Sequence, residues 1–170
     1  LLARTIADPN PSLPADRQAL LLAKLAPIRF EMGRTDEATT LIQSAVDLIG
    51  DAVTSEAANV HHRASKLSLV RGSIHPALVA AERAIEIAST CGPDTVLVEA
   101  MLTKALGLGV TESLEAGVAL AREARQRAMT QNMVSQVASS YRTEMMIINY
   151  QLGRTDASLD ALRNGLAFAE

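Results

Sequence analysis

A glycine-led pattern occurs four times in this chain of 170 residues, and it limits the possible folds more than any other feature. Two copies begin with the same four residues, GRTD, at Gly33 and Gly153, and two more begin at Gly72 and Gly109. The intervals between these glycines are roughly 40 residues, a period that is typical of repeat proteins. In such proteins each unit packs against its neighbours.

Small or apolar residues stand five, nine and twelve positions after each glycine. Steps of three and four residues place side chains on one face of a helix, so each glycine is expected to precede an amphipathic helix. A second apolar-periodic segment lies ahead of each following glycine. The residues at these positions are Ala38, Ile42 and Ala45, then Ala77, Ala81 and Ala84, then Leu114, Val118 and Ala121, and finally Ser158, Leu162 and Gly165.

This pattern predicts an all-α fold, an α-solenoid of about four antiparallel helix pairs. Glycine is expected to end the first helix of each pair because it adopts the left-handed conformation at low cost. Thr35, Thr111 and Thr155 are expected to cap the second helices. Residues 1–14 are expected to form the end of a preceding helix and a proline-rich linker, and the chain is expected to be a piece of a longer protein. The predicted pairs cover about 15–50, 54–91, 93–131 and 133–170.

Charge and composition argue against two classes of partner. The net charge is −3, so the chain lacks the basic field that binds nucleic acid or anionic lipid. No apolar run approaches the roughly 18 residues of a membrane span. The single cysteine, Cys91, cannot form an internal disulfide and fits a reducing compartment. We therefore expect a cytoplasmic protein without direct nucleic-acid or membrane contact.

The sequence also lacks the motifs of common catalytic sites. Its glycine-dense stretch, KALGLGVTES, does not have the order of a phosphate-binding loop. His61, His62, His75 and Cys91 match no usual zinc spacing. We predict no enzymatic activity, no metal and no cofactor. The alternative is a helical hydrolase or transferase with an unrecognised site.

The spacing after Gly33 and Gly72 resembles the second helix of the tetratricopeptide repeat. This resemblance implies a concave groove that binds a protein or a small effector, and counting back from each glycine in the manner of that family assigns residues to the groove. Two alternatives remain open. Residues 59–66, NVHHRASK, could form an ordinary solvated helix face, and Tyr141 and Tyr150 could pack in the core. The candidate groove residues are Asn59, His62, Arg63, Lys66, Glu99, Thr103, Thr143, Tyr150 and Gln151.

A second resemblance concerns two longer segments, TVLVEAMLTKALGLGVTESLEAGVALAREARQRA and VASSYRTEMMIINYQLGRTDASLDALRNGLAFAE. They are similar to the helical-repeat region of large bacterial LuxR-type transcription regulators. This resemblance implies a repeat domain between an ATPase and a helix-turn-helix, which passes the binding of an effector or partner to those domains. The alternative is a tetratricopeptide-like adaptor in another bacterial signalling protein. A homodimer through exposed ends of the solenoid is also expected, because end faces without capping repeats are apolar.

Overall fold

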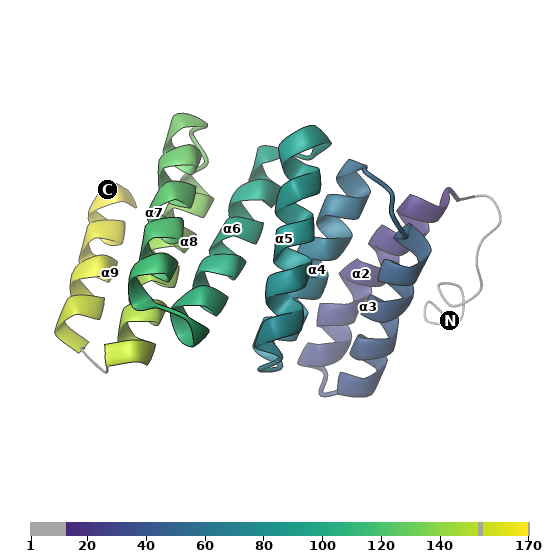
Figure 1. Cartoon of the computed structure of the whole chain (residues 1–170), viewed down its shortest axis with the longest axis horizontal. Helices are drawn as coiled ribbons and strands as arrows, with labels where there is room; N and C mark the ends of the chain where they lie inside the picture. Colours follow the sequence, from purple (N-terminus) through teal and green to yellow (C-terminus); the bar gives the residue numbers. More distant parts are fainter. Residues whose placement is uncertain (1–12, 153–154, 170) are drawn as a thin grey trace.

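The computed structural model describes residues 13–152 and 155–169, and this part of the chain forms eight α-helices and no strand (Figure 1). The expected all-α, solenoid-like fold is confirmed. Helices adjacent in sequence pack in pairs. The helices are α2 Ala15–Glu31, α3 Thr35–Ile49, α4 Ser55–Val70, α5 Ile74–Cys91, α6 Asp94–Thr111, α7 Leu114–Thr130, α8 Val134–Leu152 and α9 Thr155–Ala169.

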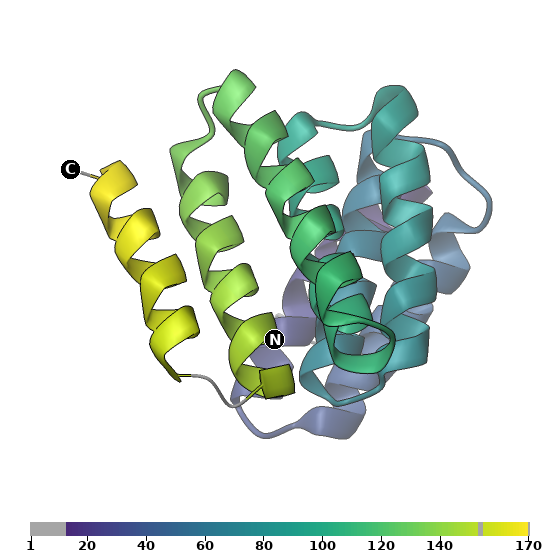
Figure 2. The same cartoon turned by 60° about the vertical axis from the view of Figure 1, so that its left-hand side comes forward.

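The helix pairs stack side by side in two rows, which Figures 1 and 2 show from two directions. The inner row consists of α2, α4, α6 and α8, and each of these helices contacts the next one in the row. The outer row consists of α3, α5, α7 and α9, and no two outer helices contact each other within the described residues. Since the inner helices lie closer together than the outer ones, the array curves with its inner row on the concave side.

The repeat is more regular in the structure than the spacing of the glycines. The inner helices start at Ala15, Ser55, Asp94 and Val134, and the outer helices start at Thr35, Ile74, Leu114 and Thr155. Successive starts in each row are almost evenly spaced, whereas the interval from Gly109 to Gly153 is clearly longer than that from Gly72 to Gly109. One repeat spans about 40 residues, longer than the roughly 34 of a standard tetratricopeptide repeat.

Gly33 and Gly72 end inner helices as expected. Their φ angles are +75° and +76°, in the left-handed region that glycine adopts without strain. Beyond Gly33, the backbone N–H of Arg34 donates to the carbonyl of Arg29 at 2.9 Å. This bond supplies a partner to a carbonyl that the end of the helix leaves free.

The expectation for Gly109 is wrong, because this glycine lies inside α6 and Thr111 is the last residue of that helix. The cap of α7 is Ser113, whose Oγ accepts the N–H of Ala116 at 3.0 Å. Thr35 is likewise the first residue of α3 and not its cap. The surroundings of Thr155 lie outside the described residues.

This shift moves the buried positions of the third repeat by one helical turn. Measured from the first residue of each outer helix, Ala38 and Ala77 correspond to Gly117 and not to Leu114. Gly117 is buried, whereas Leu114 is only half-buried. The glycine at position 109 serves close packing instead: a Cβ atom there would lie 2.5 Å from Cγ2 of Ile147.

Alanine fills most of the contacts between the helices. Ala23, Ala45, Ala84 and Ala121 are fully buried, so neighbouring helices approach closely. The larger fully buried side chains, such as Ile147, lie between the repeats. Helix α6 is covered on most sides, since it packs against α4, α5, α7 and α8. The inner helices consequently keep their remaining free faces for the concave side.

Candidate functional site in the groove of the inner helices

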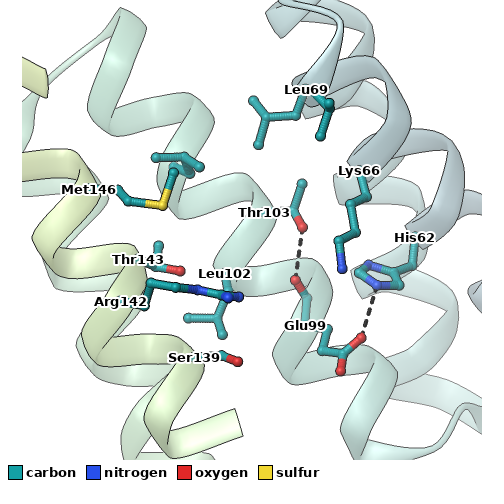
Figure 3. A pocket seen from close by; sticks show the side chains of 12 residues that line it. His62, Lys66, Leu69, Glu99, Leu102, Thr103, Ser139, Arg142, Thr143 and Met146 are labelled. Carbon is teal, nitrogen blue, oxygen red and sulfur yellow. Dashed lines mark hydrogen bonds and ion pairs between the residues drawn. The ribbon is translucent and has the colours of Figure 1, made fainter. Parts of the chain in front are cut away.

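A hollow of about 360 Å³ lies between α4, α6 and α8, on the concave side (Figure 3). Each helix contributes side chains spaced by three or four residues, the spacing that keeps them on one helix face. All three helices run in the same direction, because an antiparallel outer helix follows each of them. The lining residues are His62, Lys66, Leu69 and Val70 of α4, Glu99, Leu102, Thr103 and Leu106 of α6, and Ser139, Arg142, Thr143 and Met146 of α8.

The hollow changes from polar to apolar along the helix axes. On each of the three helices, the lining residues that come first in the sequence form the polar end. They include His62, Glu99 and Ser139. Its apolar end is formed by the last residues of each set, including Leu69 and Met146 (Figure 3). Because the helices are parallel, residues of similar character lie at the same level. The result is an amphipathic cavity whose volume falls within the range of small-molecule sites.

Glu99 joins the three inner helices at the polar end. Nε2 of His62 on α4 donates to Oε2 of Glu99 at 3.0 Å, and Nε2 of Gln136 on α8 donates to Oε1 at 3.1 Å. The hydrogen bond from His62 is the main reason that the pKa of Glu99 falls from 4.5 to about 2, and Lys66 contributes through its charge. Glu99 is therefore ionised at neutral pH and already has donors on both oxygens.

His62 is held in the wall of the hollow, with only 7% of its side chain exposed. Because Nε2 donates to Glu99, the other ring nitrogen, Nδ1, takes no part in that bond. That atom is buried and has no hydrogen-bond partner among the described residues. His62 thus acts as a fixed donor to Glu99.

Lys66 and Arg142 provide positive charge from opposite sides of the hollow. Figure 3 shows both side chains extending into the space between α4 and α8. Neither forms a salt bridge within the part of the chain that the structure describes. The hydroxyl groups of Ser139 and Thr143 nearby make no hydrogen bond with any described residue. These groups can together hold an anion, with two charged donors and two hydroxyl donors.

The structure brings together five of the nine residues that the sequence assigns to the groove. His62, Lys66, Glu99, Thr103 and Thr143 line the hollow. Thr103 also donates to the carbonyl of Glu99 at 3.0 Å, within its own helix. These five residues come from all three helices, so the hollow depends on the stacking of successive repeats.

The other four predicted residues lie elsewhere. Asn59 donates to the carbonyl of Ser55 at 2.9 Å and does not line the hollow. Tyr150 is 68% exposed, beyond the apolar end, so neither the groove nor the core contains it. The side chain of Gln151 lies outside the described residues. Arg63 lines a second hollow.

That second hollow, of about 290 Å³, lies between α2 and α4. Its walls include Phe30 and Arg63, and it shares Lys66 and Val70 with the first hollow. Nε of Arg63 is buried and has no hydrogen-bond partner within the described ranges. The two hollows form adjoining parts of one concave face, separated by Lys66.

Sequence reasoning missed Arg142, Ser139 and Met146, although the repeat carried a signal for Ser139 and Met146. Measured from the first residue of each helix, Ser139 on α8 stands where Glu99 stands on α6, and Met146 stands where Leu106 does. Such pairs occupy the same place in successive repeats. A comparison of α6 with α8 in this register therefore identifies the α8 wall.

Outside the groove, two of the three arginines in residues 122–128, REARQRA, bind the buried carboxylate of Glu144. Arg122 donates to Oε1 of Glu144 at 2.6 Å and Arg125 to Oε2 at 2.9 Å. The guanidinium of Arg125 also lies 4.0 Å from the ring centroid of Tyr141. These interactions join α7 to α8, so two arginines of the run have a structural role.

Two further searches of the structure concern metal-binding groups and membrane-spanning helices. The described residues hold no group of three or more His, Cys, Asp or Glu side chains that could bind a metal ion. None of the helices in the described ranges has both the length and the apolar character needed to cross a membrane.

Comparison with known proteins gives no match. No family model fits the sequence, no curated protein is significantly similar to it, and no solved structure is significantly similar to its fold. The function of the groove is consequently argued from its own geometry.

Proposed function

We propose that this chain is a non-catalytic binding domain, and that its groove between α4, α6 and α8 takes a segment of a partner protein or a small effector. One observation carries the proposal: Lys66 and Arg142 face the same hollow and have no salt-bridge partner among the described residues. Two like charges that face one hollow repel each other, and a bound anion removes that cost. The adjoining apolar wall supplies further binding energy.

A ligand in this position contacts three repeats at once. Each repeat packs only against its neighbours, so a ligand that alters the spacing of α4, α6 and α8 changes the curvature of the array. A change in curvature can be passed to domains attached on either side. This property suits a sensor or a scaffold.

We further propose that the chain is the repeat region of a cytoplasmic LuxR-type transcription regulator, which passes binding to an ATPase and a DNA-binding domain of the same longer chain. The resemblance of residues 95–128 and 137–170 supports this context. The alternative is an adaptor of another signalling protein, without a transcriptional role. The complete reading frame separates the two, because only the regulator has a helix-turn-helix after the repeats.

The binding role is tested by photo-crosslinking in bacterial cells that express the complete gene. The crosslinker p-benzoylphenylalanine is placed at Thr103 in the groove and, as a control, at the exposed Ala119 on α7. We expect an adduct at Thr103 that disappears when Lys66→Glu and Arg142→Glu are added. Adducts confined to the Ala119 position contradict the proposal.

Self-association through an end of the array is a separate proposal. The outer face of α9 exposes Leu159, Leu162 and Leu166, which are 41%, 41% and 66% accessible and share one helix face. An apolar face of this kind favours pairing between copies. Sedimentation of the chain against the variant Leu162→Glu with Leu166→Glu tests it, and an unchanged sedimentation coefficient refutes it.

A further inference from the structure

We propose that the hollow between α4, α6 and α8 is a site for an aliphatic carboxylate, with its carboxylate between Lys66 and Arg142 and its chain toward Met146. This inference rests on the proposed function and names the chemical class of the ligand. A free aliphatic acid and a peptide that ends in an aliphatic residue both present this chemistry. The experiment below distinguishes these two sources.

The charges of the polar end favour an anion over a cation. Lys66 and Arg142 are the cationic side chains of the lining, and Glu99 is its carboxylate. Glu99 does not neutralise them fully, because it is one carboxylate against two cations. Both of its oxygens also already accept hydrogen bonds, from His62 and Gln136. An incoming carboxylate thus meets two charged donors, whereas an incoming ammonium group meets an acceptor that is already in use.

The hydroxyl groups favour a carboxylate held directly by the protein. Ser139 and Thr143 lie on α8 beside Arg142, and neither hydroxyl has a hydrogen-bond partner among the described residues. Thr143 is only 8% exposed, so its position is fixed by packing. Both hydroxyl groups are therefore available to donate to a carboxylate bound in the hollow.

The apolar end sets the nature and length of the tail. Leu69, Leu106 and Met146 follow the charged level by about one helical turn, which is about 5.4 Å. A chain of about four or five carbons covers this distance. Leu102, which is 5% exposed, lies under the junction of the two ends. A doubly charged or fully polar anion leaves the apolar end uncovered, and an acid with a short tail covers it.

The experiment is an amide-resolved NMR titration of the ¹⁵N-labelled chain with sodium hexanoate at neutral pH. A ligand of about eight non-hydrogen atoms that gains about 0.3–0.5 kcal/mol per atom binds in roughly the millimolar range, which NMR measures directly. We expect saturable shifts at Thr103, Leu106 and Ser139, and an affinity at least roughly tenfold above that of acetate. Hexanol and hexylammonium are expected to bind more weakly than hexanoate.

Charge-removing variants provide the matched comparison. Lys66→Gln with Arg142→Gln is expected to weaken hexanoate binding roughly tenfold or more, because each charge-assisted hydrogen bond contributes substantially. The control is Lys24→Gln with Arg127→Gln, which removes two exposed cations outside the hollow. Met146→Ser, at an exposed position, is expected to reduce the preference for hexanoate over acetate.

Two peptides identify the source of the carboxylate. Acetyl-Gly-Gly-Leu with a free carboxyl group is compared with the same peptide carrying a terminal amide. Stronger binding of the free-acid peptide than of hexanoate assigns the site to a protein C-terminus, and the reverse assigns it to a free acid. Either result supports the shared chemistry.

Two results overturn the inference: hexanol binding as tightly as hexanoate, or no saturable shift at hexanoate concentrations up to about 50 mM. The proposed function is judged separately, by the crosslink at Thr103. If that crosslink persists while hexanoate fails to bind, the groove is a binding surface for a different ligand. If both fail, the groove has no binding role.

Discussion

A Cβ atom at Gly117 of α7 would lie 2.6 Å from the Cα atom of Gly109 in α6, so these two helices meet backbone against backbone. On another side, Gly109 faces the fully buried side chain of Ile147 in α8. Three helices therefore meet at one glycine. Because α6 and α8 form two walls of the groove, this contact also sets the width of the groove.

Gly109→Ala is expected to destabilise the chain by about 1–3 kcal/mol, the usual cost of overpacking a well-packed core. The added methyl group would stand 2.5 Å from Cγ2 of Ile147, whose branched side chain is 0% exposed and cannot move aside. Urea unfolding followed by circular dichroism measures the change in the free energy of unfolding.

Gly107→Ala is the matched control in the same helix. Its methyl group would meet the end of the Leu78 side chain, Cδ2, at 2.8 Å, and that end can rotate away. Alanine also favours the helical state over glycine by about 1 kcal/mol. We expect a smaller loss than for Gly109→Ala, and equal losses would show that Ile147 is not a rigid neighbour.

Glu144→Gln is expected to destabilise the chain by about 2–4 kcal/mol, because it leaves the buried end of Arg125 without its anion. Glu144 is 5% exposed and accepts hydrogen bonds from both Arg122 and Arg125. Thermal and urea unfolding test this expectation. The control is Glu123→Gln, an exposed position on α7, for which a change within about 0.5 kcal/mol is expected.

The two arginines should differ in their effects. The side chain of Arg122 is 62% exposed and that of Arg125 only 14%. Arg122→Ala should therefore cost at most about 1 kcal/mol, as is usual for an exposed ion pair, while Arg125→Ala also removes the contact with Tyr141. A larger loss of stability for Arg122→Ala than for Arg125→Ala would contradict this expectation.

Glu99 makes the stability of the chain depend on pH in the acid range. Its pKa in the folded chain is about 2, lowered from 4.5 mainly by the hydrogen bond from His62. Below pH 4.5 the unfolded chain takes up this proton first, so stability is present above 4.5 and is lost as the pH falls toward 2. The difference between the urea midpoints measured at pH 5 and at pH 3 should therefore be smaller in Glu99→Gln than in the wild type. Glu123→Gln should follow the wild type.

His61 adds a second dependence near neutral pH. Burial lowers its pKa below 6.5, and the nearby charge of Arg83 lowers it further. The unfolded chain therefore binds this proton more readily, and stability is lost as the pH falls below 6.5. We expect His61→Phe to lose less stability than the wild type between pH 7.5 and pH 5. The same substitution at the exposed His75 should leave the dependence unchanged.

The repeat could be predicted because it depends on the spacing of residues within single helices. The small residues Ala38 and Ala45 must face an inner helix for the two helices to pack closely, so their spacing shows the fold directly. Gly109 could not be assigned in the same way. A glycine that ends a helix and one that allows close packing look alike in sequence, and the neighbour that distinguishes them here, Ile147, belongs to the next repeat.

Part of the groove was predictable from the helical period, since predicted residues of both α4 and α6 line the hollow. Gly72 ends α4, so the direction of His62 and Lys66 follows from the helical period. On α8 the same reasoning selected Tyr150, which lies one turn beyond Met146 on the same face and past the hollow. How far the hollow extends depends on side chains from three repeats, and no single helix contains that information.

The parallel course of α4, α6 and α8 has a consequence for how such a groove can diverge in evolution. A substitution at Thr103 or Met146 changes one position of the lining and leaves the alanine contacts on the opposite helix face intact. Loss of a single residue within α6 would instead rotate all later side chains by about 100° and turn the lining into the interior. The groove can thus acquire new ligand preferences by point replacement, whereas a change of length inside an inner helix would disrupt both the lining and the core.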